Sequence, residues 1–425
     1  MRNLLFLALL MTLPLSGEVT YAKEVSRIMQ GKCQQCHRPN DIAPFALSSY
    51  DDAVAWSDDI KRVVNEGLMP PWKPVAGHGE FRDSFALTTQ EKVDLLAWID
   101  GGTPMGNEGD MPEALPTKGD WSLGEPDLTV KMAESFTPVR GRDTYRCFVL
   151  PTGLEADRYV SAVDVVPGNR QSVHHVILYL DSTGKAEELD AADEGPGYNC
   201  LGGPGTPIVG NFSLADLGNL ASALTYTLGG WAPGTRAHML PAGVGIPLSK
   251  KARIVMQVHY YSAVSRDPDQ TRVGIYFAKT KVEKPLFFLP IVQQRLSIPA
   301  GKADHMETAT FTVPFLLDNH VINVFPHMHL LGTEIKLEVT RGSSSTPMML
   351  IDKWDFNWQG PYTYTNSLAV PAGSTVRMSC KYDNSTNNPR NPSNPPKRVT
   401  WGEGTEDEMC VAFMGVTLDR FNPLF

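Results

Sequence analysis

The sequence predicts a multidomain protein in which a small all-α domain is followed by two all-β sandwich domains. A chain of 425 residues has material for about three domains of ordinary size. Apolar residues recur at helical spacing between residues 23 and 104, whereas β-branched and aromatic runs separated by turns fill the chain beyond residue 127. The 36 glycines and 33 prolines suit a loop-rich β architecture better than a helical bundle.

The charge balance excludes some partners. The formal net charge is −9, and no basic block occurs along the chain. We therefore expect neither nucleic acid nor an anionic lipid surface as a partner.

Residues 1–22 have the features of a cleaved export signal. Arg2 supplies the positive charge, Leu4 to Leu15 form an apolar core, and small residues near Ala22 suit cleavage. An uncleaved membrane anchor is the alternative, but the apolar run is short and no later run of about 18 apolar residues follows. We expect a periplasmic protein without stable membrane insertion.

The all-α domain, residues 23–104, is expected to contain an apolar stripe at helical spacing, formed by Val54, Ile60, Val63 and Val64. A second helix should begin after Thr88, where a Thr-Thr-Gln-Glu run is typical of a capping box, and end at Gly101-Gly102. Residues 105–126 are rich in Gly, Pro, Asp and Glu and are interpreted as a linker.

The run Cys33-Gln34-Gln35-Cys36-His37 predicts one covalently attached c-type haem. In such a run both thiols bond to the haem vinyl groups and the histidine ligates the iron. A thioredoxin-like redox pair is the alternative, but it needs no adjacent histidine and usually follows a strand. Met69 is the expected second axial ligand, ahead of Met105 and Met111. Packing beside Trp72 is the structural alternative for Met69.

This first domain resembles a class I cytochrome c over its whole length. The gap between the haem motif and Met69 is shorter than is usual in that family.

Short strands are expected throughout the β region, at residues 159–166, 173–180, 253–261, 321–331, 334–340 and 375–382. Because roughly 300 residues exceed the size of a single sandwich, we expect two, residues 127–290 and 291–425. The break is expected near Leu289 to Gly301, where two prolines interrupt a hydrophobic stretch.

Histidines in the β region occur in three strand-like runs, which contain His174 with His175, His259, and His327 with His329. Side chains at i and i+2 of a strand share a face, so His327 and His329 can bind one ion together. Adjacent histidines point to opposite faces unless a bulge rotates the backbone. Each run also has a structural interpretation, as a core histidine or an exposed strand face.

The four remaining cysteines, Cys147, Cys200, Cys380 and Cys410, can pair as disulfides in an oxidising compartment. A zinc site is the alternative, although none of the four has a second cysteine at metal-ligand spacing.

The ordered runs from Asp143 to Met414 resemble the copper type II, ascorbate-dependent monooxygenases, which include peptidylglycine α-hydroxylating monooxygenase and dopamine β-monooxygenase. The matching segments are Asp143-Thr144-Tyr145-Arg146-Cys147, Val173-His174-His175, Gln257-Val258-His259-Tyr260, His327-Met328-His329 with Gly332, and Glu406-Asp407-Glu408-Met409-Cys410.

The resemblance implies two jelly-roll-like domains and two copper ions. One ion would be held by His174, His175 and His259, and the other, which binds and activates O2, by His327, His329 and Met409. It also implies disulfides Cys147–Cys200 and Cys380–Cys410. Imidazole suits copper in either oxidation state, and a thioether favours Cu(I).

The implied activity is hydroxylation of a C–H bond of a small-molecule or peptide-like substrate with O2. Electrons would come from ascorbate or another redox protein, delivered through the chain's own haem. The family's peptide-binding arginine is not found, because Phe325 and Pro326 occupy that stretch. The aromatic run Trp354 to Trp358 could line a pocket, but a cross-strand ladder is the preferred interpretation.

Two other functions remain open from the sequence. One is a non-enzymatic periplasmic electron-transfer or copper-handling protein that uses the same ligands. The other is a β-sandwich carrier without copper. Substrate, reductant, haem potential and oligomeric state are not specified by the sequence.

Overall fold

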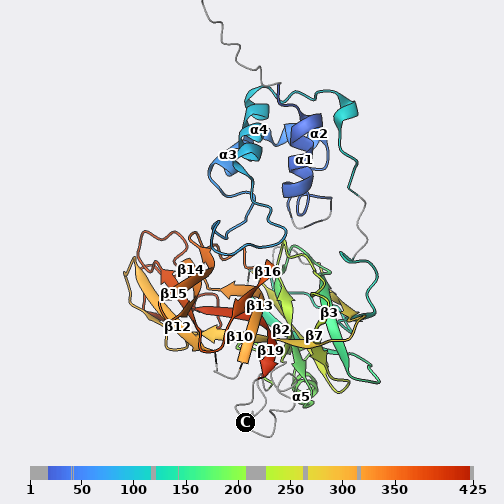
Figure 1. Ribbon diagram of the computed structural model, residues 1–425, viewed down its shortest axis with the longest axis vertical. Helices are drawn as coiled ribbons and strands as arrows, with labels where there is room; N and C mark the ends of the chain where they lie inside the picture. The colour runs from blue at the N-terminus through green and yellow to red at the C-terminus, as the bar shows by residue number, and fades with distance from the viewer. Residues whose placement is uncertain are drawn as a thin grey trace, which may run out of the picture. The chain divides into compact units, whose positions relative to one another are not determined.

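The computed structural model describes residues 18–39, 41, 43–115, 121–141, 143–206, 226–261, 267–313 and 317–421 (Figure 1). The chain divides into two compact units. The helical unit comprises Met1–Pro71 and Phe85–Pro116, and the β unit comprises Trp72–Ser84 and Thr117–Phe425. The prediction that the chain beyond the helices is all-β, in sandwiches, is confirmed.

The helices of the helical unit pack around a small hydrophobic core. This core includes Trp98 and Tyr21, whose ring centroids lie 5.9 Å apart. The predicted capping box at Thr88 is confirmed, and a second one at Ser49 begins the preceding pair of helices. The elements are η1 (Tyr21–Val25), α1 (Ser26–Ile28), η2 (Met29–Cys33), α2 (Tyr50–Ala55), α3 (Ser57–Asn65), α4 (Thr89–Asp100) and η3 (Glu108–Asp110).

The segment 72–84, called the strap below, lies between α3 and α4 in sequence yet belongs to the β unit. Val75 donates its backbone N–H to the carbonyl of Leu350, and the ring of Trp72 meets Tyr362 edge-on at 5.5 Å. The expected helical domain is therefore interrupted by a stretch that packs with the strands, because its aromatic and backbone groups find partners there.

The first sandwich packs two sheets around one core, with strand orders β1-β9-β3-β7 and β5-β2-β8-β4-β6. Buried side chains from both sheets meet in this core, for example Val160 and Leu178. The elements are β1 (Leu128–Lys131), β2 (Thr144–Pro151), β3 (Arg158–Val166), β4 (Val173–Asp181), α5 (Lys185–Ala192), β5 (Tyr198–Asn199), β6 (Thr227–Trp231), β7 (Val244–Leu248), β8 (Arg253–Tyr260) and β9 (Arg272–Phe277).

The second sandwich packs β10-β19-β13-β16 against β12-β17-β14-β15, with a small β11-β18 pair beside them. Its strands are β10 (Lys284–Val292), β11 (Ser297–Ile298), β12 (His305–Thr312), β13 (Leu317–His327), β14 (Gly332–Arg341), β15 (Ser344–Ile351), β16 (Tyr362–Val370), β17 (Thr375–Tyr382), β18 (Val399–Thr400) and β19 (Val411–Phe421).

The domain break expected after residue 290 falls inside β10, which pairs with β19 along most of its length. At its start, Lys284 and Pro285 also pair in parallel with β7, so one eight-stranded sheet runs through both sandwiches. Beyond Pro285 no other strand pairs with the second edge of β10 in the described chain. A proline on an unpaired edge is tolerated, so Pro290 does not end the strand.

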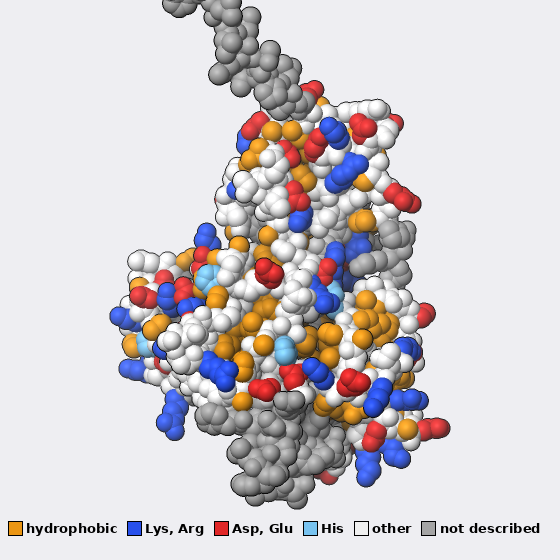
Figure 2. Space-filling model, viewed as in Figure 1, with side chains coloured by type: hydrophobic (Ala, Val, Ile, Leu, Met, Phe, Trp, Pro, Cys, Tyr) orange, Lys and Arg blue, Asp and Glu red, His pale blue; other side chains and the backbone are white. Residues whose placement is uncertain are grey.

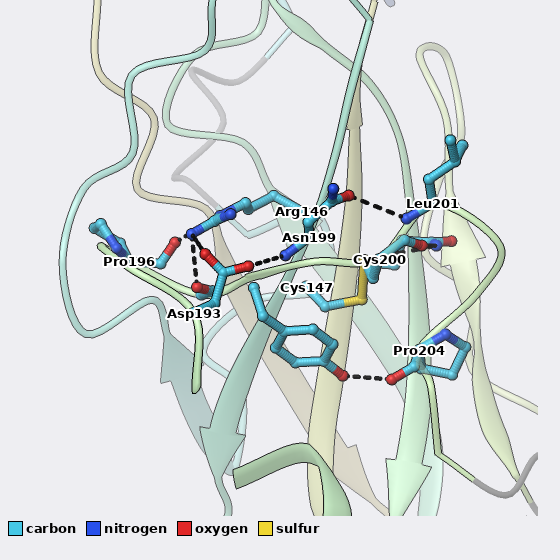
Figure 3. Close-up of a disulfide and its surroundings, with 11 residues drawn as sticks. Arg146, Cys147, Asp193, Pro196, Asn199, Cys200, Leu201 and Pro204 are labelled. Carbon is cyan, nitrogen blue, oxygen red and sulfur yellow. Dashed lines mark hydrogen bonds and ion pairs between the residues drawn. A yellow bond between two sulfur atoms is a disulfide. The ribbon is translucent and has the colours of Figure 1, made fainter. Parts of the chain in front are cut away.

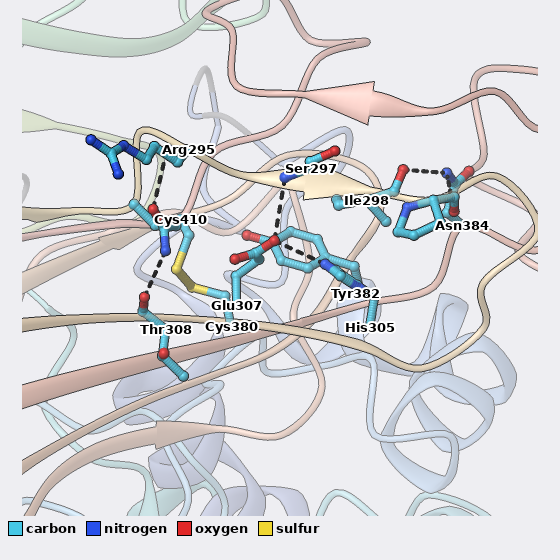
Figure 4. Close-up of polar contacts among 12 residues, drawn as sticks. Arg295, Ser297, Ile298, His305, Glu307, Thr308, Cys380, Tyr382, Asn384 and Cys410 are labelled. Atoms are coloured by element: carbon cyan, nitrogen blue, oxygen red, sulfur yellow. Dashed lines mark hydrogen bonds and ion pairs between the residues drawn. A yellow bond between two sulfur atoms is a disulfide. The ribbon is translucent and has the colours of Figure 1, made fainter.

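Both disulfides implied by the family resemblance are present. Cys147–Cys200 links β2 to the end of β5 (Figure 3), beside Arg146, whose guanidinium pairs with Asp193 at 3.1 Å. Cys380–Cys410 links β17 to the start of β19 (Figure 4). Cys147, Cys200, Cys380 and Cys410 are therefore all engaged in disulfides, which excludes a zinc site at these four residues.

Most of the expected signal peptide, residues 1–17, lies outside the described residues. Tyr21 and Ala22 are buried in the helical core, so cleavage after Ala22 would remove two packed residues. The middle of the expected linker, residues 116–120, is also outside the described part.

The charge distribution on the surface and the length of the helices can be compared with the expectation of no nucleic-acid or membrane partner. Lys and Arg side chains are interspersed with Asp and Glu on the face drawn in Figure 2. Within the described ranges, no helix is long and apolar enough to span a bilayer.

Candidate metal centre

Three predicted ligands of the first copper site converge on neighbouring strands of one sheet. His175 of β4 pairs directly with His259 of β8, and the register shifts between Val173 and His175. The irregularity is the bulge that adjacent histidines need in order to point toward one another. As a result Nδ1 of His174 lies 3.1 Å from Nδ1 of His175, and one ring nitrogen from each of the three histidines falls within 4.8 Å of the others.

The predicted pair His327 and His329 is also brought together, with the two Nε2 atoms 3.1 Å apart. The expected strand over residues 321–331 lies four residues earlier than predicted, because β13 runs from Leu317 to His327 and His329 follows it outside the strand. His329 is held there by its Nδ1, which lies 3.0 Å from the carbonyl oxygen of Asp407.

The two histidine groups adjoin one another across the two sandwiches. The ring centroids of His175 and His327 are 6.1 Å apart. The five imidazoles, from β4, β8 and the end of β13, therefore form one continuous group, called the histidine cluster below.

Met409, the predicted sulfur ligand, is buried two residues before β19. The last pair of the β13–β19 register is His327 with Val411, so the residues that follow β13 and those that precede β19 leave the same end of the sheet. The Glu408 carboxylate oxygen Oε2 accepts the backbone N–H groups of both residues, at 3.2 Å from Met409 and 2.9 Å from His329.

Glu408 is a functional residue that the sequence did not single out. Its carboxylate is fully buried and also accepts the Leu331 N–H at 2.6 Å. Burial raises the pKa of Glu408 to about 8, although the backbone N–H groups act in the opposite direction. The buried carboxyl group of Glu408 therefore joins the backbone at His329 and Leu331 to the residues that precede β19. Its neighbour Glu406 is exposed, and nothing in the run of acids distinguishes the two.

Burial keeps the imidazoles neutral. It lowers the pKa of His174 to about 3 and that of His329 to about 4, and burial together with neighbouring imidazoles lowers the pKa of His175 and His327 well below the usual value. A neutral imidazole carries the free lone pair that a metal ion requires.

Several ring nitrogens are buried with no hydrogen-bond partner among the described residues, namely Nε2 of His174 and both ring nitrogens of His259. Asp143 Oδ2 lies 3.6 Å from Nε2 of His259, which is too far for a hydrogen bond. Unsatisfied buried nitrogens cost free energy, and a bound metal ion removes that cost. The histidine cluster therefore fits copper.

Aromatic rings pack against the histidine cluster. Tyr145 stacks on His259 with centroids 4.1 Å apart, and Phe356 stacks on His174 at 5.0 Å. The run 354–358 lies in the loop between β15 and β16, so the cross-strand ladder prediction is wrong. The loop is fixed by Trp354, whose indole N–H donates to the His329 carbonyl at 3.2 Å.

In the helical unit, the run Cys33 to His37, which is predicted to attach haem, begins at the last residue of η2. The backbone N–H of His37 donates to the Cys33 carbonyl, and Nδ1 of His37 lies 3.1 Å from the Phe45 carbonyl oxygen. That contact leaves Nε2 for a metal, as a haem-ligating histidine requires. Cys33 and Cys36 form no disulfide, and burial raises the pKa of the Cys33 thiol to about 12. A thioredoxin-like pair has a lowered thiol pKa instead.

The candidate axial methionines differ in their surroundings. Met69 lies in the loop after α3, where its N–H donates to the Val63 carbonyl. Met105 packs against the helical core, and Met111 is exposed. The choice of Met69 stays a prediction.

Comparison with known proteins identifies the second sandwich. Residues 288–416 match the family model described as the copper type II ascorbate-dependent monooxygenase, C-terminal domain. No curated protein sequence matches the chain.

Among solved structures, the chain resembles the major capsid protein P2 of bacteriophage PM2, with 7% identity, 68% of this chain and 96% of that chain covered, and a TM-score of 0.25. It also resembles a structure of infectious bursal disease virus, Gx strain, with 7% identity, 73% and 77% covered, and a TM-score of 0.22. Neither similarity bears on function. The family match does: residues 288–416 are similar to the C-terminal domain of the copper type II, ascorbate-dependent monooxygenases, a family of oxidoreductases that use two copper ions.

Proposed function

We propose that this chain hydroxylates a C–H bond of a small organic substrate with O2, at two copper ions held by the histidine cluster and Met409. The observation that supports this most directly is the convergence of five imidazoles from three distant runs. Met409 adjoins them, because its backbone N–H and that of His329 donate to the same oxygen of Glu408. The reaction joins a C–H bond, O2, two electrons and two protons to give an alcohol and water.

The ligands divide into two sets with different roles. His174, His175 and His259 would hold the ion that supplies a second electron, and His327, His329 and Met409 would hold the ion that supplies the chemistry with O2. Copper supplies the one-electron chemistry, and a thioether ligand favours Cu(I), the state that reacts with O2. Tyr145 and Phe356 cover the imidazoles and keep water away from them.

The test is a search for an oxygenated product. The copper-loaded chain is incubated with ascorbate, isotopically labelled O2 and a small-molecule extract, and we expect one compound to gain one labelled oxygen atom. His329→Ala should retain the fold and lose this product. Copper binding without substrate-linked oxygen uptake would indicate electron transfer or copper handling instead.

The proposed electron inlet is a covalent haem in the helical unit of an exported, periplasmic protein. Cys33 and Cys36 would anchor it, with His37 and Met69 as axial ligands. The free Nε2 of His37 supports this assignment. A haem tethered to its acceptor is present at an effective concentration of about a millimolar, far above that of a diffusing partner. Ascorbate or another redox protein would reduce it.

Haem attachment and electron transfer can be measured without a substrate. The chain produced with c-type haem maturation should carry one covalent haem, which Cys33→Ser/Cys36→Ser abolishes. With reduced haem and Cu(II) loaded under nitrogen, stopped-flow absorbance should show haem oxidation as the Cu(II) resonance signal disappears. His174→Ala/His175→Ala is the control that removes the acceptor. Haem that stays reduced beside bound Cu(II) would exclude this electron route.

A further inference from the structure

A cavity of about 310 Å³ lies between the two sandwiches. It is lined by β3, β4, β6 and β7 of the first sandwich, by β10, β13, β16 and β19 of the second, and by Arg82 of the strap. Since one water occupies about 30 Å³, this space holds a molecule of about ten non-hydrogen atoms.

The cavity begins beside the histidine cluster. Its wall includes Ile177 and Phe325, which lie two residues from His175 on β4 and from His327 on β13. Residues two apart on a strand face the same side, about 7 Å apart. The five histidines are not among the lining residues, so one end of a molecule in the cavity lies against Ile177 and Phe325, next to the proposed copper ligands.

That end of the cavity, and most of its wall, is apolar. The lining includes Ile246, Leu286, Phe288, Ile322, Phe325 and Phe413. Phe325 occupies the stretch in which the family's peptide-binding arginine is not found, so the wall next to His327 offers no charge to a ligand. Burial of hydrocarbon is the contribution this wall can make.

Basic groups lie farther along the same cavity. Arg82 donates its backbone N–H to Thr363, which pairs with Asn323 of β13, four residues or about 13 Å from His327. Arg236 and His238 belong to the same lining, and burial, together with the two guanidiniums, lowers the pKa of His238 against the opposing effect of Asp83.

The acids near these groups already have partners. Asp83 pairs with His238 at 3.0 Å, and Asp164 accepts both the N–H and the hydroxyl of Ser122 at 2.6 Å. Arg82 and Arg236 are exposed, and no acid of the described chain forms an ion pair with either; Arg82 donates from its guanidinium only to the Thr365 carbonyl, at 3.4 Å. Both guanidiniums can therefore bind an anion through charge-assisted hydrogen bonds.

One buried polar group also lacks a partner. The hydroxyl of Tyr226 lines the cavity and makes no hydrogen bond within the described chain, although only 6% of this residue is exposed. A ligand oxygen would satisfy it.

We infer that this cavity binds the substrate, and that the substrate is a narrow, mainly apolar molecule with a carboxylate at one end. The carboxylate lies at Arg82 and Arg236, and the hydrocarbon end lies beside His175 and His327, so the oxidised carbon is distal to the carboxylate. This assignment rests on the proposed function, but binding itself requires no metal.

Calorimetry on the metal-free full chain tests the inference with decanoate, decylamine and decanol as probes. We expect decanoate to bind more tightly than the other two, and more weakly as salt is raised. Arg82→Gln/Arg236→Gln should weaken decanoate binding by about tenfold, since each exposed pair contributes little alone. Lys250→Gln removes an exposed cation outside the lining and should change nothing. Ser161→Phe should fill the cavity and abolish binding of all three probes.

Equal binding of decanoate and decylamine, or no binding of any probe, would overturn the inference. Copper content and ascorbate-driven product formation are measured on the same preparation. If both are normal while no carboxylate binds, the substrate class is wrong and the proposed function stands. If decanoate binds as expected but no product forms with copper, the proposed function fails and the binding site remains.

Discussion

Replacing Met409 with leucine is expected to reduce substrate-linked oxygen uptake by about 100-fold or more while the protein stays folded. Leucine keeps the volume and apolar character of the buried side chain, so the cost in stability should be below about 1.5 kcal/mol. It removes the thioether of Met409, whose backbone N–H donates to the same Glu408 oxygen as that of His329. Even partners outside the ligand shell contribute about 10–100-fold to metal affinity or activity, so loss of a ligand should cost at least that.

The measurements are copper content, oxygen uptake and the haem spectrum of the same preparation. The matched control is Met414→Leu, which changes another buried methionine of β19 that packs in the core of the second sandwich. Both variants should retain the haem proposed for the helical unit and the copper proposed for His174, His175 and His259. Equal activity of the two variants would show that the Met409 thioether is not a ligand.

Glu408→Ala is expected to give the largest loss of stability of any single substitution at the centre. The carboxylate accepts backbone N–H groups of His329, Leu331 and Met409 in a buried position. Each buried donor left without an acceptor costs about 1–3 kcal/mol, so the free energy of unfolding should fall by about 3 kcal/mol or more. Denaturant unfolding of the metal-free chain measures this directly.

The same substitution should also weaken copper binding at His327, His329 and Met409, by about 10–100-fold, because the turn that carries these ligands loses its support. Glu408→Gln retains one acceptor oxygen and should lose less stability. Glu406→Ala removes an exposed acid from the same loop and should change neither quantity. A Glu408→Ala chain as stable as Glu406→Ala would mean that water replaces the carboxylate.

Local features of the fold could be read from the sequence because local chemistry determines them. The capping box at Thr88 and the strands that carry His175, His259 and His327 depend on residues a few positions apart. The disulfides followed from the order of the cysteines within a family resemblance, and not from spacing. The family resemblance likewise indicated which histidines and which methionine could bind copper, but it did not give the distances between their side chains.

Features that depend on pairing between distant segments could not be predicted. The 6.1 Å approach of His175 to His327 requires two sandwiches joined through β7 and β10. The burial of Glu408 depends on a turn more than seventy residues earlier in the chain. The strap has no periodic pattern, and only its partners on β15 and β16 explain its place in the β unit.

The strap has a consequence for the modularity of this chain. Because residues 72–84 belong to the β unit while their sequence neighbours on both sides belong to the helical unit, the helical part is not a cassette that can be cut off at a single point. A truncated chain starting after residue 116 would lack Arg82 and the Trp72 ring that covers Tyr362. Recombination that exchanges the helical unit for another would therefore have to preserve residues 72–84, so the two units would have to be inherited together.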